Sequence, residues 1–197
     1  MSDKNNVIVG SVTAIGGVSL APTGSKLPTD CTTALDPAFG RAGYVTSDGF
    51  DREEKIDTDT VIALGGDAVH VVKKGTSATV SYGFLEYLNP IVQKALYGAN
   101  NVTSTPANAT HGNQLAIAGV LDLQDPQAMV IDLVDGAKTG RLVFGSAQLT
   151  DRDKYTMKDD DAASRTVTWA LLPMGTDSNG KSIYFREYWD DGKKATA

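Results

Sequence analysis

Alternation of apolar and polar side chains, interrupted at glycines, is the feature that most restricts how this chain can fold. In KIDTDTVIAL, residues 55–64, Ile56 and Ile62 fall on one face, while Asp57 and Asp59 fall on the other. A period of two residues is typical of antiparallel strands that bury one face. This stretch therefore predicts a half-buried strand, and we expect the chain to be mainly β.

The same alternation recurs along the chain and is bounded by turn signals. These signals are Lys74-Gly75, Asp135-Gly136 and Asn179-Gly180, and glycine after asparagine or aspartate favours a tight hairpin turn. The Gly16-Gly17 and Gly65-Gly66 pairs predict bends or bulges. The further segments with strand character are residues 67–74, 76–84, 128–136, 165–174 and 181–189. Together they predict about eight to ten strands.

One helix is expected, in YLNPIVQKALYGANN. Asn89 is a suitable N-cap, Pro90 suits the first helical position, and Gly98 suits the C-terminal stop. Gln93 and Lys94 are expected to face away from the apolar stripe. That stripe consists of Leu88, Ile91, Val92, Ala95 and Leu96. The elements predict a mainly β (α+β) fold, with two packed antiparallel sheets forming a sandwich or partly closed barrel and one flanking helix.

Size and charge restrict the organisation further. The 197 residues are expected to form one domain, with an N-terminal arm and long loop at about 20–49 and a short C-terminal tail at about 190–197. A net charge of −6 argues against a surface that grips nucleic acid. The single cysteine, Cys31, allows no intrachain disulfide, and no secretory signal or membrane-length apolar run is expected.

The sequence predicts no catalytic residue, no metal site and no cofactor, and we expect the protein not to be an enzyme. His70 and His111 are far apart and lack partners at metal-ligand spacing. Residues 151–161 resemble a calcium loop only superficially, because Thr156 occupies the glycine place and Ala162 the glutamate place. We expect a solvated acidic loop there.

Two long segments have no regular period. Residues 20–49, LAPTGSKLPTDCTTALDPAFGRAGYVTSDG, and residues 98–114 are rich in small residues, prolines and glycines. Loops of this length are usually functional or disordered. Open β-sheets also leave edges that invite another chain. These features together indicate a subunit of a larger β assembly.

A family resemblance rests on blocks that occur in one order along residues 15–102. The first blocks are Ala21-Pro22-Thr23-Gly24, Leu27-Pro28-Thr29-Asp30, Thr32, Leu35, Phe39, Gly43-Tyr44-Val45 and Asp48-Gly49. The later blocks are IALGGDAV and SYGFLEYLNPIVQKALYGANNV. They resemble the major tail proteins, or tail tube proteins, of long-tailed bacteriophages, especially those that infect actinobacteria. Cys31 departs from the small residue that is usual at its position.

The resemblance implies a structural virion protein. Six subunits would form a ring, and rings would stack into a hollow tail tube through which DNA passes into the host. Implied partners are further copies of the chain, the tape measure protein and genomic DNA in the lumen, and terminator and tip proteins at the ends. The implied location is the phage tail, assembled in the host bacterial cytoplasm. The open alternatives are a tube protein of a contractile or type VI secretion system, another virion part such as a tail terminator or head decoration protein, and a hydrolase.

Two hypotheses concern assembly. In the first, residues 20–49 form an assembly segment whose anchors contact their own or an adjacent subunit. The anchors are Leu20, Leu27, Pro28, Leu35, Phe39 and Tyr44. In the second, residues 51–60 begin a long hairpin at the contact between rings, where the charges of Glu53 and Glu54 find partners.

Overall fold

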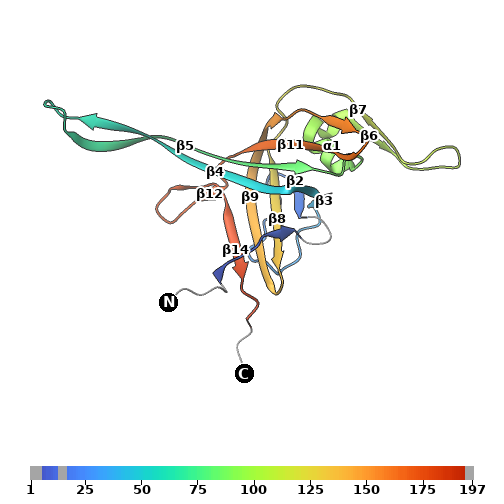
Figure 1. Ribbon diagram of the computed structural model, residues 1–197, viewed down its shortest axis with the longest axis horizontal. Helices are drawn as coiled ribbons and strands as arrows, with labels where there is room; N and C mark the ends of the chain where they lie inside the picture. Colours follow the sequence, from blue (N-terminus) through green and yellow to red (C-terminus); the bar gives the residue numbers. More distant parts are fainter. Residues whose placement is uncertain (1–5, 13–16, 194–197) are drawn as a thin grey trace.

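The computed structural model of the protein describes residues 6–12 and 17–193, and its body is a curled antiparallel sheet with a helix at one end (Figure 1). The ten-stranded sheet has the order β3-β2-β8-β9-β11-β5-β4, while β1 pairs with β8, β10 with β11 and β14 with β9. Gly16 and the end of the predicted C-terminal tail, residues 194–197, lie outside the described residues.

The sheet contains strands of very different length. Its strands are β1 (Ser11–Val12), β2 (Val18–Pro22), β3 (Gly40–Gly43), β4 (Val45–Ile62), β5 (Ala68–Phe84), β8 (Gln127–Asp135), β9 (Lys138–Arg152), β10 (Thr156–Lys158), β11 (Asp161–Leu171) and β14 (Arg186–Asp190). Two separate hairpins are β6 (Val102–Thr105) with β7 (Gln114–Ile117), and β12 (Gly175–Thr176) with β13 (Ser182–Ile183). The helices are α1 (Pro90–Tyr97) and the 3-10 helix η2 (Ala99–Asn101).

The sheet folds over itself along β9. One edge of β9 pairs with β8, while the other pairs with β14 over residues 139–143 and with β11 over residues 147–152. The core contains Met129 and Phe144 from β8 and β9 together with Tyr82 and Trp169 from β5 and β11. The Tyr82 hydroxyl donates to the Met129 sulfur over 3.2 Å. The prediction of a sandwich of antiparallel sheets with one flanking helix is confirmed, and the sheet does not close into a barrel.

Helix α1 closes one end of the core. The Asn89 side chain accepts from the Ile91 N–H over 3.0 Å, and the Gly98 N–H donates to the Lys94 carbonyl, so both predicted ends are confirmed. The orientation of Gln93 was mispredicted: this side chain is fully buried and donates to the Tyr87 carbonyl over 2.6 Å. The helix lies against β3 and the β6–β7 hairpin, so more than one of its faces is covered.

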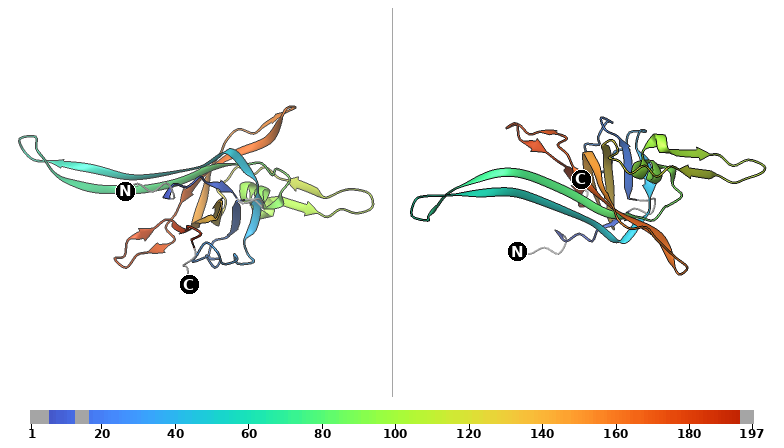
Figure 2. Two further views of the ribbon diagram at one scale, coloured as in Figure 1. Left: turned by 60° about the horizontal axis from the view of Figure 1, so that its bottom comes forward. Right: turned by 90° about the horizontal axis from the view of Figure 1, so that it is seen from above.

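The long hairpin β4–β5 leaves the body as a two-stranded ribbon (Figures 1 and 2). The two strands predicted at 67–74 and 76–84 are one strand, because Lys74-Gly75 forms a bulge, not a turn. The turn lies at residues 63–67, where the Ala63 N–H donates to the Asp67 carbonyl over 2.8 Å. A bulge adds one residue to one strand and keeps the ladder continuous, so β5 passes through Lys74-Gly75 without turning back.

Shorter hairpins also project from the body (Figure 2). Residues 98–114, expected to lack regular structure, contain η2 and most of the β6–β7 hairpin, where the Asn108 side chain accepts from the Thr110 and His111 N–H groups. The acidic stretch 151–161 runs through β10 and the turn into β11. The turn predicted at Asn179-Gly180 is confirmed, since the Asp177 N–H donates to the Lys181 carbonyl across it.

Candidate assembly surfaces

The segment 20–49 begins in β2, ends in β4 and crosses the outer face of β8 and β9 between them. Leu27 lies over Gly145 of β9, where a Cβ atom would come within 3.0 Å of the leucine Cδ1. Val130 and Val143, on β8 and β9, are fully buried although they are not part of the central cluster. The segment is therefore a cover for the second face of these two strands.

A buried arginine fastens this cover. Arg141 of β9, only 6% exposed, donates from Nε to the Asp132 carboxylate over 2.6 Å. Its Nη1 donates to the carbonyl oxygens of Thr33, over 2.8 Å, and Asp30, over 3.1 Å. Charge-assisted hydrogen bonds of this kind are stronger than neutral ones. The guanidinium thus ties the middle of the segment to the sheet.

Asp30 shapes the turn that Arg141 contacts. Its carboxylate accepts from the Thr32 N–H over 2.7 Å, and from the Thr33 N–H and the Thr33 hydroxyl over 2.5 Å each. The hydrogen bond from the Thr33 side chain, followed by those from the backbone of Thr33 and Thr32, holds the pKa of Asp30 far below its ordinary value of 3.8. The Thr-Asp-x-Thr block in the sequence is the local signal for this turn.

The structure distributes the sequence-predicted assembly residues over several environments. Leu20 is buried in the core, whereas Tyr44 is 53% exposed beside Glu86, which accepts from the Tyr44 N–H over 3.0 Å. Glu53 and Glu54 are exposed on opposite faces of β4, where the β4–β5 ribbon leaves the body. The half-buried members are Leu27, Pro28, Leu35 and Phe39. Leu20 and Leu27, the first two predicted anchors, thus contact their own subunit. The predicted assembly residues as a whole do not form one cluster.

The distal ribbon, which consists of residues 56–62 of β4 and 68–74 of β5, carries uncovered apolar side chains on both faces. Ile56 and Val71 continue the face that covers the core nearer the body, and they are 64% and 60% exposed. Val61 and Val72 lie on the opposite face and are 47% and 39% exposed. At the turn, Leu64 is fully exposed. Exposed apolar side chains gathered on one projecting element make the distal ribbon a candidate interaction surface.

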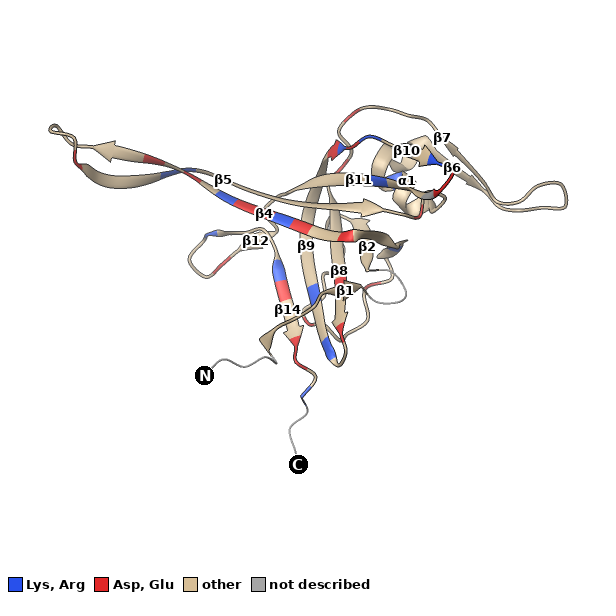
Figure 3. Cartoon of the chain, in the orientation of Figure 1, with Lys and Arg blue, Asp and Glu red and all other residues tan. Residues whose placement is uncertain are grey.

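Charged contacts hold the root of the ribbon against β14. Arg52 donates to Glu54 over 2.8 Å and also pairs with Glu187, and its guanidinium lies 4.0 Å from the centre of the Phe185 ring. Burial acts to raise the pKa of Glu187, but hydrogen bonds from Arg52 and Trp189 outweigh it and hold that pKa below its ordinary value. Figure 3 shows the charges of both signs that follow β4 at this level.

The outer face of the β4–β5–β11 region is polar. Its side chains include Ser77, Thr79 and Ser81 of β5 and Thr166 and Thr168 of β11, all on the face opposite the buried core residues. The hydroxyl oxygens of Ser81 and Thr168 lie 2.9 Å apart. On β4 the same face continues with Asp51, Glu53 and Lys55. This face is a hydroxyl-rich wall without large apolar side chains.

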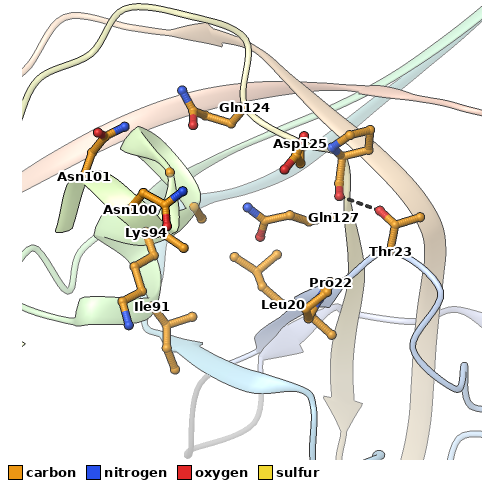
Figure 4. Close-up of a pocket in the computed structure, with 15 residues that line it drawn as sticks. Leu20, Pro22, Thr23, Ile91, Lys94, Asn100, Asn101, Gln124, Asp125 and Gln127 are labelled. Carbon is orange, nitrogen blue, oxygen red and sulfur yellow. Dashed lines mark hydrogen bonds between the residues drawn. The ribbon is translucent and has the colours of Figure 1, made fainter. Parts of the chain in front are cut away.

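A groove of about 720 Å³ separates α1 from the adjoining ends of β2 and β8 (Figure 4). Leu20, Ile91 and Ala95 contribute apolar surface, while Lys94 stands on the helix wall and Asp125 on the opposite wall. The other lining residues are Ala21, Pro22, Thr23, Gly98, Ala99, Asn100, Asn101, Gln124, Pro126 and Gln127. The Thr23 hydroxyl bonds to the Pro126 carbonyl and closes one end.

The described residues offer no cluster for metal chemistry: among them, no group of three or more His, Cys, Asp or Glu side chains could hold an ion. His70 lies in the ribbon, and His111 bonds to Asn108 over 2.8 Å in the β6–β7 turn. Within the same residues, no helix has the length and apolar character needed to span a membrane.

Sequence reasoning missed Arg141, the groove and the exposure of the ribbon. Arg141 stands among strand residues with no local sign that its partners lie 108 and 111 residues earlier. The groove is formed by α1 and by strand ends that are distant in sequence. For the ribbon, a signal did exist: two alternating segments flank Gly65-Gly66, which is a typical arrangement for a long hairpin.

Comparison with known proteins gives one family. A family model described as phage tail tube protein matches residues 1–182. No curated protein matches the chain significantly. The family is a structural one, not an enzyme family, and a phage tail tube protein is a self-assembling virion component. The match covers most of the 197 residues, and the chain belongs to the phage tail tube protein family.

Proposed function

We propose that six copies of this chain form a ring and that the rings stack into a hollow tube through which phage DNA enters the host. The observation that carries the proposal is the β4–β5 ribbon. Its distal part is a two-stranded hairpin with exposed apolar side chains on both faces. An isolated two-stranded hairpin is marginally stable in water. Contact with neighbouring subunits would supply the missing cover.

Ring closure is supported by the sheet edges. Within the described chain, β4 is the last strand of the sheet, so its outer edge has no partner strand from the same subunit. The opposite end of the sheet is the short strand β3. Pairing of unlike edges between neighbours would create a heterologous interface that closes into a ring. Such pairing would also remove an exposed edge that otherwise favours aggregation.

The polar outer face is proposed as the wall of the lumen. Serine and threonine side chains of β5 and β11 dominate this face, and Asp51 and Glu53 add negative charge at its β4 margin. DNA binding depends largely on cations that replace the counterions of the phosphates. Lys55 lies on the same face of β4, and its ammonium group pairs with the Asp57 carboxylate over 3.0 Å. A wall dominated by hydroxyl and carboxylate groups would therefore let DNA and the tape measure protein pass without specific binding.

The sequence-based assembly residues remain part of this proposal in a narrower form. Pro28, Leu35, Phe39 and Tyr44 are available at the surface of the segment that covers β8 and β9, at the ring or stacking seam. Glu53, at the margin of the lumen wall, and Glu54, on the opposite face of β4, are proposed to contribute charge where one ring meets the next. Terminator and tip proteins would bind the two ends of the tube, and assembly would take place in the bacterial cytoplasm before the tail joins the virion.

Electron microscopy of the purified chain tests the proposed function. We expect hollow tubes with sixfold symmetry in cross-section. The double variant Ile56→Ser/Val71→Ser should keep the fold, because both side chains are exposed, and should lose tube formation. Met157→Ser, at an exposed apolar site on β10, is the matched control and should form tubes. Free rings or monomers from the unaltered chain under all assembly conditions would contradict the proposal.

A further inference from the structure

The tip of the ribbon and the groove beside α1 lie far apart along the longest axis of the molecule. In Figure 1, where the longest axis is horizontal, the turn between β4 and β5 is at one extreme, and α1 lies toward the other end, beside the β6–β7 hairpin. A projecting feature at one end and a recess toward the other allow identical copies to join head to tail. Such a contact does not close on itself and therefore grows a filament.

The tip has the form of a single apolar projection. Leu64 is fully exposed, and the next two residues, Gly65 and Gly66, have positive φ angles of 115° and 100°. A Cβ atom at either glycine would meet nothing within 4 Å. The two glycines add no side chain beside Leu64, so this leucine is the large side chain that projects from the turn. Ile62, 64% exposed, extends the apolar surface on the adjoining ribbon.

The groove and its rim offer matching apolar surface. The groove is lined by Leu20, Ile91 and Ala95, with Asn100 at its helix side (Figure 4). The neighbouring loop joins β7 to β8 and arches over α1 (Figure 1). It carries further exposed apolar side chains. They are Val120, Leu121 and Leu123, which are 43%, 85% and 71% exposed.

One pair of opposite charges can form between the two sites. Asp67 is the one Lys, Arg, Asp or Glu residue among residues 60–70, and it is exposed at the base of the turn. Lys94 is exposed on the helix wall of the groove, beside Ile91 (Figure 4). Asp125 stands on the other wall, so a carboxylate entering the groove has one favourable side. Complementary charges of this kind fix the register of a contact.

We propose that the ribbon tip of one subunit seats in the groove of a second copy, with Leu64 between α1 and the ends of β2 and β8 and Asp67 facing Lys94. Ile62 and its apolar neighbours then cover the loop that carries Leu121. This inference rests on the proposed stacking of subunits and names the two surfaces that meet. It makes the groove the receptor for the next ring.

Cysteine pairing between separately purified variants tests the contact. Leu64→Cys and Asn100→Cys, each also carrying Cys31→Ser, are mixed, assembled and oxidised. A disulfide requires Cα atoms about 4.4–6.8 Å apart, so only a seated tip can react efficiently. We expect covalent dimers in mixed tubes. Tubes of either variant alone, and tubes in which Asn179→Cys replaces the groove variant, are the controls and should give none above background.

Charge exchange provides the second arm. Asp67→Lys and Lys94→Asp should each lower tube yield about tenfold, which corresponds to about 1.4 kcal/mol, and the double variant should restore it. Tubes that form normally but show neither the cross-link nor the rescue would overturn this inference and leave the proposed function intact. Absence of tubes from the unaltered chain would instead overturn the proposed function on which the inference rests.

Discussion

Arg141 on β9 donates to the carbonyl oxygen of Thr33, a residue 108 positions earlier, over 2.8 Å. This contact makes the covering segment part of the folded subunit before any assembly takes place. Replacing Arg141 by Met should leave the Asp132 carboxylate without its partner and free the segment. We expect a loss of about 2 kcal/mol in the free energy of unfolding, because removal of one member of a partly buried pair leaves an uncompensated charge.

Urea denaturation followed by circular dichroism measures this loss. Lys26→Met, in the same segment but exposed, is the matched control and should change the free energy of unfolding by less than about 0.5 kcal/mol. Equal stability of the Arg141→Met variant and the unaltered chain would show that the arginine does not fasten the segment.

Asp30 should make this segment sensitive to acid. Its pKa is lowered in the folded state, so the folded protein binds fewer protons there than the unfolded chain does. The stabilisation is complete above the unfolded pKa of about 3.9 and is lost as the pH falls toward the lower folded-state pKa. Asp30→Asn removes this titration. We expect the stability difference between the two proteins to be largest at neutral pH and to shrink below about pH 4.

Urea midpoints at a series of pH values would measure the Asp30 effect. A difference that stays constant from neutral pH to about pH 2.5 would mean that the Asp30 carboxylate does not contribute through its charge.

The distal ribbon should be dynamic in the monomer and protected in the tube. Its backbone hydrogen bonds join two strands without cover on either face. Local opening of such a unit costs little free energy, and amide exchange reports it. We expect residues 56–62 and 68–74 to exchange within seconds in monomers and at least about tenfold more slowly in tubes. The core strand β8 serves as the internal reference, and equal exchange of the ribbon in both states would argue against assembly through it.

Glu53 and Glu54 should respond differently to charge reversal. Glu54 shares a face with Arg52 and receives its guanidinium, whereas Glu53 lies on the polar outer face. Reversal of both residues should shorten tubes, and the effect should weaken as salt screens it. Glu54→Lys alone should account for most of the shortening, because it also places a cation beside Arg52. Tube lengths from micrographs at low and high salt measure this, and unchanged lengths would exclude a role in stacking.

Thr79→Lys tests the proposed lumen wall. The side chain lies at the centre of the hydroxyl-rich face, and six copies per ring would place a cationic band along the DNA path. We expect tails of normal length that release DNA more slowly, with the delay relieved by salt. Lys55→Thr is the opposite change, because Lys55 already lies on the same face of β4. This variant should not slow DNA release. Normal release from Thr79→Lys phage would place the lumen on another face.

Much of the fold was predictable from the sequence because the signals are local. Alternation in β8 and β11, and the Asn89 and Gly98 ends of α1, depend on residues within one strand or one turn. Alternation does not say what covers the apolar face of a strand. The pattern around Ile56 and Ile62 therefore looked like that of a half-buried strand in the body, although both side chains are exposed on the ribbon. The Lys74-Gly75 pair likewise fits a bulge as well as a turn. The Arg141 contacts and the groove depend on chain closure over long sequence distances, which local patterns do not encode.

The unbroken course of β5 has a mechanical consequence. The strand runs from Ala68 near the ribbon tip to Phe84 in the core, and its last part pairs with β11 through six register positions between Thr79 and Phe84. A force that pulls the tip along the strand would load the hydrogen bonds of all six β5–β11 pairs at the same time. It would not break them one after another, as a peeling force would. Tension between rings would thus be shared by a whole ladder of hydrogen bonds and by the side chains of Tyr82 and Phe84 beneath it. A tube joined in this way would bend at its contacts before its subunits unravel.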